Sequence, residues 1–312
     1  MVMKAKNIRH LLFTAVVLFG AASCEDDVQR DVFRAIPETE TGKKLVENTD
    51  LVASVYSDSS YTLKEGVTVT EFAFLSMEGY ATRVFISEID LTNPDVTIEV
   101  STPFNKPAFG RQVMTEQAMY EDAEGHRVLG GVNGDFFAAG TGVPQGILYK
   151  EGVALKTSVT DAVNTWFAIK DDGLAMIGDQ DMFDDVKDSF MEALGGRVQL
   201  VNDGVILPQT DDRREPRTCV GVSQDGTKVY FLAVDGRNYH YSNGMMYTEL
   251  AKFQKALGAY DAINLDGGGS TTFFIRRTAE TGEGLFDIRN WPYDNGGAER
   301  PVANGLLIIS RN

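Results

Sequence analysis

The sequence predicts a single strand-rich α+β domain, with a mixed sheet core and a few helices. Three segments alternate apolar and polar residues with the two-residue period of a β-strand, namely 67–74, 83–89 and 96–100. Helical signals are fewer: residues 111–123 suit a helix, and residues 247–257 carry an apolar stripe followed by Gly258 at the C-cap position. Because strands dominate and the helices are irregularly spaced, this pattern favours α+β over an alternating parallel-sheet fold.

Asp-Gly pairs separate several short apolar runs, and such pairs are common in tight β-hairpin turns. The pairs are Asp172-Gly173, Asp203-Gly204 and Asp225-Gly226. We therefore expect a hairpin at each of these three places. No polar break divides residues 61–312, so we expect that range to form one domain.

Residues 1–23 have the pattern of a secretory signal peptide, with a basic start, a short apolar run and small residues. The run is too short to span a bilayer. Cys24 directly after it resembles the lipidated first residue of a bacterial lipoprotein, and the acidic residues 25–27 resemble a surface-display signal. Residues 24–60 are polar and without steady periodicity, so we expect a lipidated tether and a short segment leading into the domain.

This N-terminal pattern predicts an outer-membrane lipoprotein of the cell envelope, periplasmic or surface-exposed. The expected membrane contact is a lipid anchor at Cys24. The alternative is a generic secreted protein in which Cys24 carries no lipid.

The chain is acidic, with 45 Asp and Glu residues against 29 Lys and Arg residues and a formal net charge of −16. Removal of residues 1–23, which hold three basic and no acidic residues, lowers this charge to −19. Such a surface argues against a nucleic-acid partner, and an anionic substrate needs a local basic site. Cys219 is the one cysteine besides Cys24, so no internal disulfide is expected. The sequence does not indicate an oligomeric state.

The most informative segment is 262–275, where an apolar run ends on Asp266 and three glycines precede a second apolar run. This order predicts a strand, a tight loop with a carboxylate at its mouth, and another strand. Successive glycines lose much backbone entropy on folding, so they are favoured where the chain turns sharply or a ligand approaches its N–H groups. A simple hairpin is the alternative, although two residues would suffice for its turn.

Polar side chains recur where other apolar runs begin or end, next to glycines. Such residues can converge on one mouth of a sheet, where binding and catalytic sites tend to lie. The blocks are Asn133-Gly134-Asp135-Phe136-Phe137, Arg217-Thr218-Cys219-Val220-Gly221, Asp235-Gly236-Arg237, Asn264-Leu265-Asp266-Gly267-Gly268-Gly269-Ser270-Thr271-Thr272 and Arg300-Pro301-Val302-Ala303-Asn304.

In this order, the blocks resemble the motif series of the phosphodiester glycosidase family over roughly residues 80–310. The resemblance implies an enzyme that hydrolyses a sugar-1-phosphodiester, such as N-acetylglucosamine-1-phosphate linked to another sugar, on the sugar side of the phosphate. A phosphodiester-linked carbohydrate is then the expected partner. Asp135 and Cys219 stand where the family often has Ala or another small residue, which argues against a catalytic role for Asp135.

Cleavage at the glycosidic C–O bond calls for a cation that holds the phosphate and a carboxylate near the anomeric carbon. Guanidinium groups grip phosphate oxygens bidentately, and Arg217 and Arg237 are the candidates. Asp266 is the first candidate for the carboxylate, as nucleophile or as base for water. Asp235 is the second, and its neighbour Arg237 is expected to hold its pKa low.

Amide, hydroxyl and backbone N–H groups of the same blocks can bind the sugar and the phosphate, and Ser270 or Thr272 can orient the acid. The expected substrate-binding residues are Asn133, Asp135, Asn264, Gly267, Gly268, Gly269, Ser270, Thr272 and Asn304. Two structural alternatives stay open. Asp235 can be a turn residue, and Arg217 can be a surface partner of nearby acids.

No histidine–cysteine cluster for zinc is visible, and we expect no metal or other cofactor from the sequence. Calcium or magnesium could bind oxygen atoms of Asp135, Asp235 and Asp266. Two alternative functions remain: a non-catalytic envelope lipoprotein that binds glycans, and a phosphodiesterase that cleaves the P–O bond.

Overall fold

The computed structural model describes residues 37–160, 164–277 and 284–311. The signal peptide predicted over residues 1–23, and the lipidation site predicted at Cys24, lie outside these residues. Residues Arg34–Asn312 belong to one compact unit. Within the described part of the chain, no helix is both long and apolar enough to cross a membrane.

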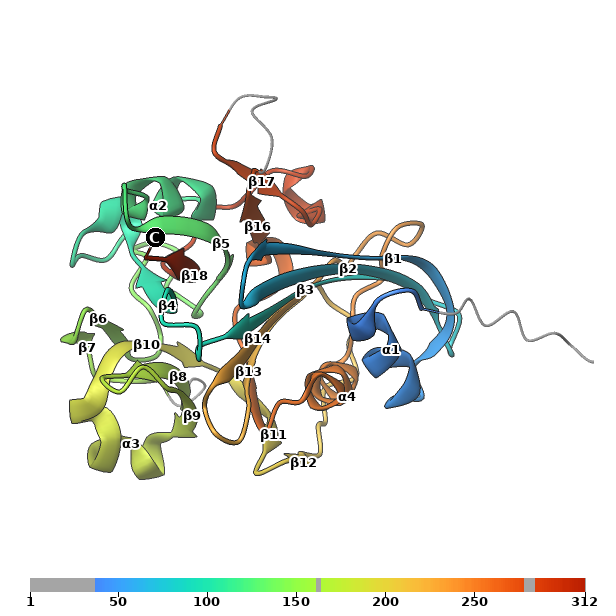
Figure 1. Cartoon of the computed structure of the whole chain (residues 1–312), viewed down its shortest axis with the longest axis horizontal. Helices are drawn as coiled ribbons and strands as arrows, with labels where there is room; N and C mark the ends of the chain where they lie inside the picture. The colour runs from blue at the N-terminus through green and yellow to red at the C-terminus, as the bar shows by residue number, and fades with distance from the viewer. Residues whose placement is uncertain (1–36, 161–163, 278–283, 312) are drawn as a thin grey trace, which may run out of the picture. The chain divides into compact units, whose positions relative to one another are not determined.

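The largest sheet has eight strands in the order β1-β2-β3-β14-β13-β15-β11-β12 (Figure 1). Neighbouring strands are antiparallel throughout this sheet. Its members are β1 (Val52–Lys64), β2 (Val67–Ser76), β3 (Ala81–Asp90), β11 (Val198–Asn202), β12 (Val205–Ile206), β13 (Arg217–Val222), β14 (Lys228–Val234) and β15 (Asp261–Asn264).

Two five-stranded sheets, also antiparallel, complete the strand framework. One contains β6 (Leu148–Lys150), β7 (Val153–Lys156), β8 (Thr165–Lys170), β9 (Ala175–Asp179) and β10 (Phe190–Gly196). The other contains β4 (Val96–Ser101), β5 (Arg127–Asn133), β16 (Phe273–Arg276), β17 (Phe286–Ile288) and β18 (Gly305–Ser310). The predicted strand-rich α+β class is confirmed, but the predicted mixed sheet is wrong, because the strand pairs within the described residues are antiparallel.

The helices are short and few. The α-helices are α1 (Glu40–Glu47), α2 (Met114–Glu121), α3 (Gln180–Val186) and α4 (Tyr247–Leu257), and the 3-10 turns are η1 (Pro103–Asn105), η2 (Lys187–Ser189), η3 (Gly268–Ser270) and η4 (Tyr293–Asn295). Both predicted helices are confirmed as α2 and α4. Gly258 caps α4 in the left-handed conformation, and its N–H bonds to the last-turn carbonyls. The three predicted Asp-Gly hairpins are confirmed as β8–β9, β11–β12 and β13–β14.

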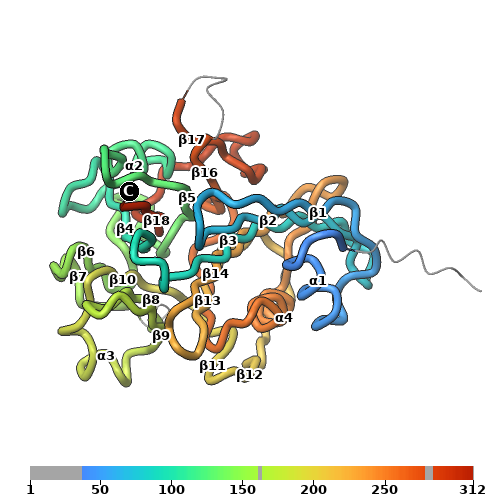
Figure 2. Tube along the Cα trace, viewed as in Figure 1, coloured from blue at the N-terminus to red at the C-terminus, as the bar shows by residue number. Residues whose placement is uncertain are grey.

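The two faces of the eight-stranded sheet bury different cores. On one face, Phe231 and Ala233 of β14 contribute to the main core, which also holds residues of both smaller sheets. On the other face, Leu232 and Val234 pack with residues of α1 and α4. This alternation is the two-residue period of a strand buried on both sides. Figure 2 shows the trace of α1 running beside that of α4, although the two helices lie far apart in the sequence.

The folded region begins earlier than predicted. We expected a tether and a leading segment over residues 24–60, but α1 and most of β1 lie within that range. β1 pairs with β2 along its length and forms an edge of the eight-stranded sheet. The predicted start of the domain at residue 61 is therefore corrected to a position before α1.

The predicted strand–loop–strand around Asp266 is confirmed as β15, η3 and β16. The two strands do not form a hairpin, because β15 lies in the eight-stranded sheet and β16 in a five-stranded sheet. We call the connecting residues 265–272 the glycine loop. It carries the chain from one sheet to another.

Candidate functional site at the glycine loop

The glycine loop packs closely against the segment that leads into β13. The N–H of Gly268 donates to the carbonyl of Pro216 at 2.9 Å. A Cβ atom at Gly267 would lie 2.6 Å from the same carbonyl oxygen, and Gly268 has a φ of +59°. Larger residues would be pushed against backbone at the first position and strained at the second. The glycines are therefore required by the loop's own packing.

Two guanidinium groups flank the outer side of this loop. A Cβ atom at Gly268 would lie 3.2 Å from Nη2 of Arg237, and one at Gly269 would lie 3.2 Å from Nη1 of Arg300. Both arginine side chains reach solvent, with 40% of Arg237 and 42% of Arg300 exposed. The loop thus lies between two accessible cations that an anionic ligand could contact.

Acidic side chains alternate with these arginines. Nε of Arg237 donates to Oε2 of Glu215 at 2.6 Å, and its Nη1 bonds to Asp294. Nη2 of Arg300 lies 3.5 Å from Oδ2 of Asp266 and donates to Oγ of Ser270. The row of charges leads from Glu215 to Asp266 across the glycine loop.

Asp266 lies at the inner end of this row, with 13% of its side chain exposed. Its Oδ1 accepts a hydrogen bond from the N–H of Gly267 at 2.9 Å. Burial is the largest influence and raises the pKa of Asp266, against the opposing effects of Ser270 and Arg300. Asp266 is therefore a nearly buried carboxyl group with a limited opening to solvent.

A second carboxyl group, that of Asp135, lies within electrostatic range of Asp266. Its backbone N–H donates to Oδ1 of Asn304 at 2.8 Å, and its Oδ2 accepts from the N–H of Gly146 at 2.7 Å. Burial, followed by smaller contributions that include the charge of Asp266, raises the pKa of Asp135 to about 7. Repulsion between neighbouring carboxylates favours the state in which one of the two is protonated over the state in which both are charged.

Two basic residues that the sequence did not single out complete this end of the site. The guanidinium group of Arg197 lies 3.9 Å from the ring centroid of Phe136 and donates to Oε1 of Gln145 at 3.0 Å. Its charge lowers the pKa of Asp266. Lys156 lowers that of Asp135. Arg197 directly follows Gly195-Gly196 at the end of β10, and this signal could have found it. Lys156 has no such neighbours.

Buried polar atoms without a hydrogen-bond partner concentrate at this site. Polar atoms in a protein interior are normally paired, so unpaired ones call for an explanation. Within the described residues, those at the site are Oδ1 of Asp135, Nε of Arg197, Oδ1 of Asn264, Oγ1 of Thr271, Nε of Arg300 and Nδ2 of Asn304. Their accumulation around Asp266 fits a region arranged to receive polar groups.

Several predicted substrate-binding groups are instead engaged within the protein. Nδ2 of Asn133 donates to the carbonyl of Asp266 at 2.7 Å, while its Oδ1 accepts from Thr218 and from the N–H of Thr272. The hydroxyl of Thr272 donates to the carbonyl of Ser270 at 3.1 Å. Asn133 and Thr272 therefore hold the loop in shape rather than face a ligand.

The backbone groups proposed as an anion cradle are also partly engaged. The N–H of Gly267 bonds to Asp266 and that of Gly268 bonds to Pro216. Nδ2 of Asn264 donates to the carbonyl of Leu265 at 2.5 Å. The predicted nest of three glycine N–H groups is thus corrected, because two of them have intramolecular acceptors.

Arg217 does not join the charges at the loop. Its guanidinium carbon lies 3.9 Å from the ring centroid of Tyr247, and its Nη2 donates to the carbonyl of Arg213 at 3.1 Å. Residues i and i+2 of a strand share a face, and Cys219 packs in the core beneath α4. Arg217 therefore points to the α4 side, which corrects its predicted role as a phosphate ligand.

Asp235 is also turned away from Asp266. Its oxygens accept hydrogen bonds from the N–H of Trp291 and from Nδ2 of Asn290. Burial raises its pKa to about 6, although we expected Arg237 to hold it low. That expectation is wrong because Arg237 pairs with Glu215 and Asp294. Asp235 is a buried anchor rather than a second catalytic carboxylate.

The acids proposed as calcium or magnesium ligands do not form a common group, since Asp235 faces Trp291. In the described ranges, the group whose ligand atoms could share an ion is Glu99, Glu121 and His126. Lys150 already donates to Glu121 there, at 2.5 Å. This cluster is separate from the glycine loop.

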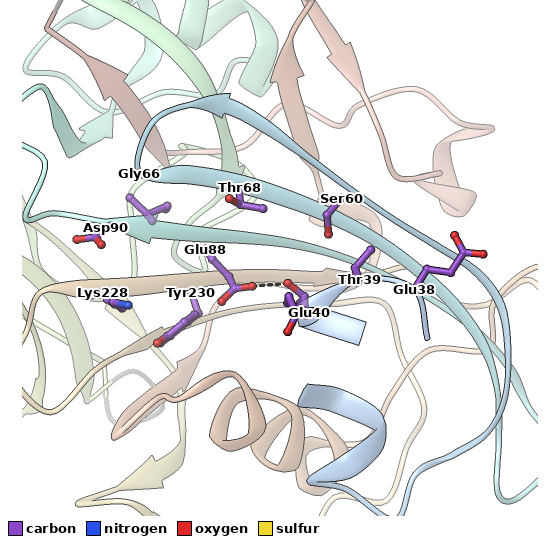
Figure 3. Close-up of a pocket in the computed structure, with 12 residues that line it drawn as sticks. Glu38, Thr39, Glu40, Ser60, Gly66, Thr68, Glu88, Asp90, Lys228 and Tyr230 are labelled. Atoms are coloured by element: carbon purple, nitrogen blue, oxygen red, sulfur yellow. Dashed lines mark hydrogen bonds between the residues drawn. The ribbon is translucent and has the colours of Figure 1, made fainter. Parts of the chain in front are cut away.

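A pocket of about 590 Å³ lies elsewhere, between the start of α1 and the strands β1, β2, β3 and β14 (Figure 3). Glu88 projects into it and accepts a hydrogen bond from Thr41. None of the predicted site residues lines this pocket. The glycine loop therefore remains the candidate site.

The family model described as phosphodiester glycosidase matches residues 126–309, and the chain belongs to that family. This confirms the resemblance noted in the sequence. The curated relatives include the N-acetylglucosamine-1-phosphodiester alpha-N-acetylglucosaminidases of Mus musculus and Homo sapiens, which are 31% and 29% identical over 167 and 166 residues. Each match covers 47% of this chain, and 31% of the mouse or 32% of the human protein. The chain thus matches about a third of the length of these relatives.

Solved structures show the same fold at lower identity. The zebrafish N-acetylglucosamine-1-phosphodiester alpha-N-acetylglucosaminidase catalytic domain superposes with a TM-score of 0.57 and 20% identity, over 82% of this chain and 88% of that chain. A hypothetical protein from Synechocystis superposes with a TM-score of 0.60 and 13% identity, over 83% of this chain and 64% of that chain.

Proposed function

We propose that this protein hydrolyses a sugar-1-phosphodiester, such as N-acetylglucosamine-1-phosphate linked to another sugar, at the glycosidic C–O bond. The observation that carries the proposal is the position of Asp266 beside Arg300 on the glycine loop. A carboxylate next to an accessible guanidinium matches the two requirements of this reaction, which are an anionic group at the sugar and a cation at the phosphate.

In the proposed reaction, the phosphate of the substrate lies over Gly268 and Gly269, between Arg237 and Arg300, where it replaces the carboxylate of Asp294 as the partner of Arg237. Asp266 acts at the anomeric carbon, either as a nucleophile or as a base for water. A carboxylate oxygen of Asp266, or a water that gives its proton to Asp266, bonds to the anomeric carbon as the C–O bond breaks, and the electron pair of that bond leaves with the phosphate oxygen. The charge that develops there is stabilised by the two guanidinium groups. Where Asp266 is the nucleophile, water then hydrolyses the glycosyl–Asp266 ester.

Protonation of Asp135 favours the ionised form of Asp266. Its pKa of about 7 keeps it largely neutral under mildly acidic conditions. A neutral Asp135 adds no repulsion to Asp266 or to an incoming phosphate, so Asp266 can be the ionised member of the pair. Ser270, which bonds to Asp266 and to Arg300, orients the reacting carboxylate.

The test is hydrolysis of N-acetylglucosamine-1-phosphate diesters by the full chain in oxygen-18 water. We expect the label in the released sugar, because water or Asp266 attacks carbon. Label in the phosphate would support the alternative of P–O cleavage, and binding without release of reducing sugar would support the glycan-binding alternative. The first anomer released distinguishes a nucleophilic Asp266 (retention) from a basic one (inversion).

We also propose that Cys24 anchors the protein in the outer membrane of the cell envelope. The sequence around residues 1–27 supports this proposal. A Cys24→Ser chain should move from the membrane fraction to the soluble fraction and lose incorporation of labelled fatty acid. Unchanged fractionation would contradict the anchor.

A further inference from the structure

We propose that Trp291 and Tyr293 form a binding subsite for the sugar on the far side of the phosphate, which is the aglycone of the diester. This inference rests on the proposed hydrolysis. It deepens that function by assigning residues that hold the second sugar of the diester.

The first support is the position of the segment 291–295 against the glycine loop. Nδ2 of Asn295 donates to the carbonyl of Gly269 at 3.0 Å, and Asp294 bonds to Arg237. The two aromatic residues directly precede Asp294 in the chain, at positions 291 and 293. Their segment therefore lies beside the place where the phosphate meets Arg237.

The second support is the exposure of the two rings. Trp291 and Tyr293 are each 48% exposed, whereas the other tryptophan, Trp166, is fully buried. Trp and Tyr are enriched at binding interfaces, because each side chain has an apolar ring and a polar group. The flat face of an aromatic ring complements the C–H face of a pyranose, so a sugar is a suitable occupant.

The third support is the rigidity of the Trp291 backbone. Asp235 accepts from its N–H, and Nδ2 of Asn290 donates to the carbonyl of Thr271 at 3.0 Å. The indole lies against Gly297, where φ is +90° and a Cβ atom would come within 2.6 Å of the ring. A ring held in place before binding loses little conformational entropy when a ligand packs on it.

The order of groups along the glycine loop indicates which sugar occupies this subsite. Asp266 and Arg300 lie at one end and Arg237 at the other. The carboxylate of Asp294 lies between the two arginines, 3.2 Å from where a Cβ atom at Gly269 would be, and it bonds to Arg237. Because Asp266 acts on the anomeric carbon, the first sugar lies at its end. The group esterified to the other side of the phosphate then extends past Arg237 toward Trp291.

The test compares two substrates with one variant. N-acetylglucosamine-1-phosphate esterified to a hexose is compared with the same compound esterified to methanol, using the parent chain and Trp291→Ala. We expect kcat/KM for the hexose diester to fall by about tenfold, and kcat/KM for the methyl diester to change less than about twofold. Tyr56→Ala, at an exposed tyrosine of β1, is the matched control and should change neither value.

Equal losses on both substrates, or no loss on either, would overturn the subsite. A binding measurement separates this failure from that of the proposed function. Because Trp166 is buried, the 6-phosphates of glucose, galactose and mannose should change the fluorescence of Trp291, while methyl phosphate should not. One outcome is that the parent chain cleaves no diester but shows the fluorescence change, and that Trp291→Phe does not show it. The proposed hydrolysis is then wrong and the subsite is supported. If the parent shows no change with any hexose phosphate, the subsite is wrong.

Discussion

Both carboxylate oxygens of Asp235 lie within hydrogen-bond distance of the backbone N–H of Trp291, at 2.9 and 2.8 Å. The carboxylate is buried at the end of β14, and the indole it positions is exposed beside the glycine loop. Asp235 is thus a positioning residue that fixes the segment carrying Trp291 and Asp294.

Replacing Asp235 should weaken substrate binding more than it slows the chemical step. In Asp235→Asn one acceptor oxygen becomes an NH2 group that faces other donors, so we expect a loss of about 1–3 kcal/mol in the free energy of unfolding. KM for a hexose diester should rise while kcat changes little. Urea unfolding and steady-state kinetics measure the two effects. An unchanged KM would show that the segment holds its position without this carboxylate.

Removal of the Asp266 charge should abolish turnover without unfolding the protein. We expect Asp266→Asn to lower kcat by roughly 10³-fold or more, since the amide is neither a nucleophile nor a base. Its thermal unfolding midpoint should stay near that of the parent. Asp185→Asn, at an exposed position of α3, is the matched control and should keep full activity. A folded Asp266→Asn protein with parental activity would exclude Asp266 from the reaction.

Replacing an arginine beside the glycine loop should lower activity, whereas replacing Arg217 should lower stability. Arg300→Gln and Arg237→Gln should each lower kcat/KM for the methyl diester by about 10²-fold, because a cation that stabilises developing charge is lost. Arg217→Gln should instead lower the stability, since that side chain packs on Tyr247. Arg111→Gln, at an exposed residue, is the control. A larger catalytic loss from Arg217→Gln than from Arg300→Gln would contradict the assignment.

Ionisation of Asp135 should limit activity at high pH. Its pKa of about 7 means that a second negative charge appears beside Asp266 as the pH rises through 7, and this charge repels an anionic diester. We expect kcat/KM of the parent to fall between pH 6.5 and 8.5, and the fall to be largely absent in Asp135→Asn. Profiles of kcat/KM from pH 5 to pH 9 test this. Identical profiles would show that another group titrates.

Stability should fall as the pH rises through the titration of Glu192. Burial is the main cause that raises the pKa of Glu192 from 4.5 to about 8. Between these two pKa values the native state holds a proton that the unfolded chain has released. The contribution of neutral Glu192 to the free energy of unfolding is therefore full below pH 4.5 and is lost as the pH rises through 8. We expect a decrease of roughly 2–4 kcal/mol between pH 5 and pH 9 from this group.

Glu192→Gln should flatten that dependence. The variant loses an acceptor for the N–H of Val100 or of Glu151, which lowers stability by a similar amount at each pH. Urea unfolding at pH 5 and pH 9 gives the difference. Glu47→Gln, at an exposed residue, should keep the parental pH dependence. A parental slope in Glu192→Gln would contradict the assignment.

Local patterns predicted much of the fold. The alternating segment 67–74 and the Asp-Gly turns report contacts between neighbours in sequence, so strands and hairpins were found. β1 was missed because it is an edge strand rich in Ser, with no residue in it fully buried. The placement of β15 and β16 in different sheets depends on distant pairing, which no local pattern shows.

At the site, too, local motifs were recognised and contacts between distant segments were not. Asp266 and its glycines form one contiguous motif, so the loop could be recognised. Arg217 was misassigned because its backbone lies beside the glycine loop, whereas the alternation of β13 directs its side chain to the face of the sheet that α4 covers. Arg197 and Lys156 lie at the ends of distant strands, outside the blocks that the sequence analysis singled out, although Arg197 follows Gly195-Gly196. Arg300 stood in a quoted block, but its contact with Asp266 depends on how the chain folds.

The passage of the glycine loop between two sheets limits how this family can diversify. Each end of the loop is continuous with a strand that is hydrogen-bonded into a different sheet, so a change in loop length would shift one sheet against the other. The segment 290–297 forms no strand between β17 and β18, so sheet pairing does not fix its length, and it is held by side-chain bonds of Asn290, Asn295 and Asp235 instead. Evolutionary changes in substrate range should therefore accumulate in that segment, while the reacting carboxylate stays in place.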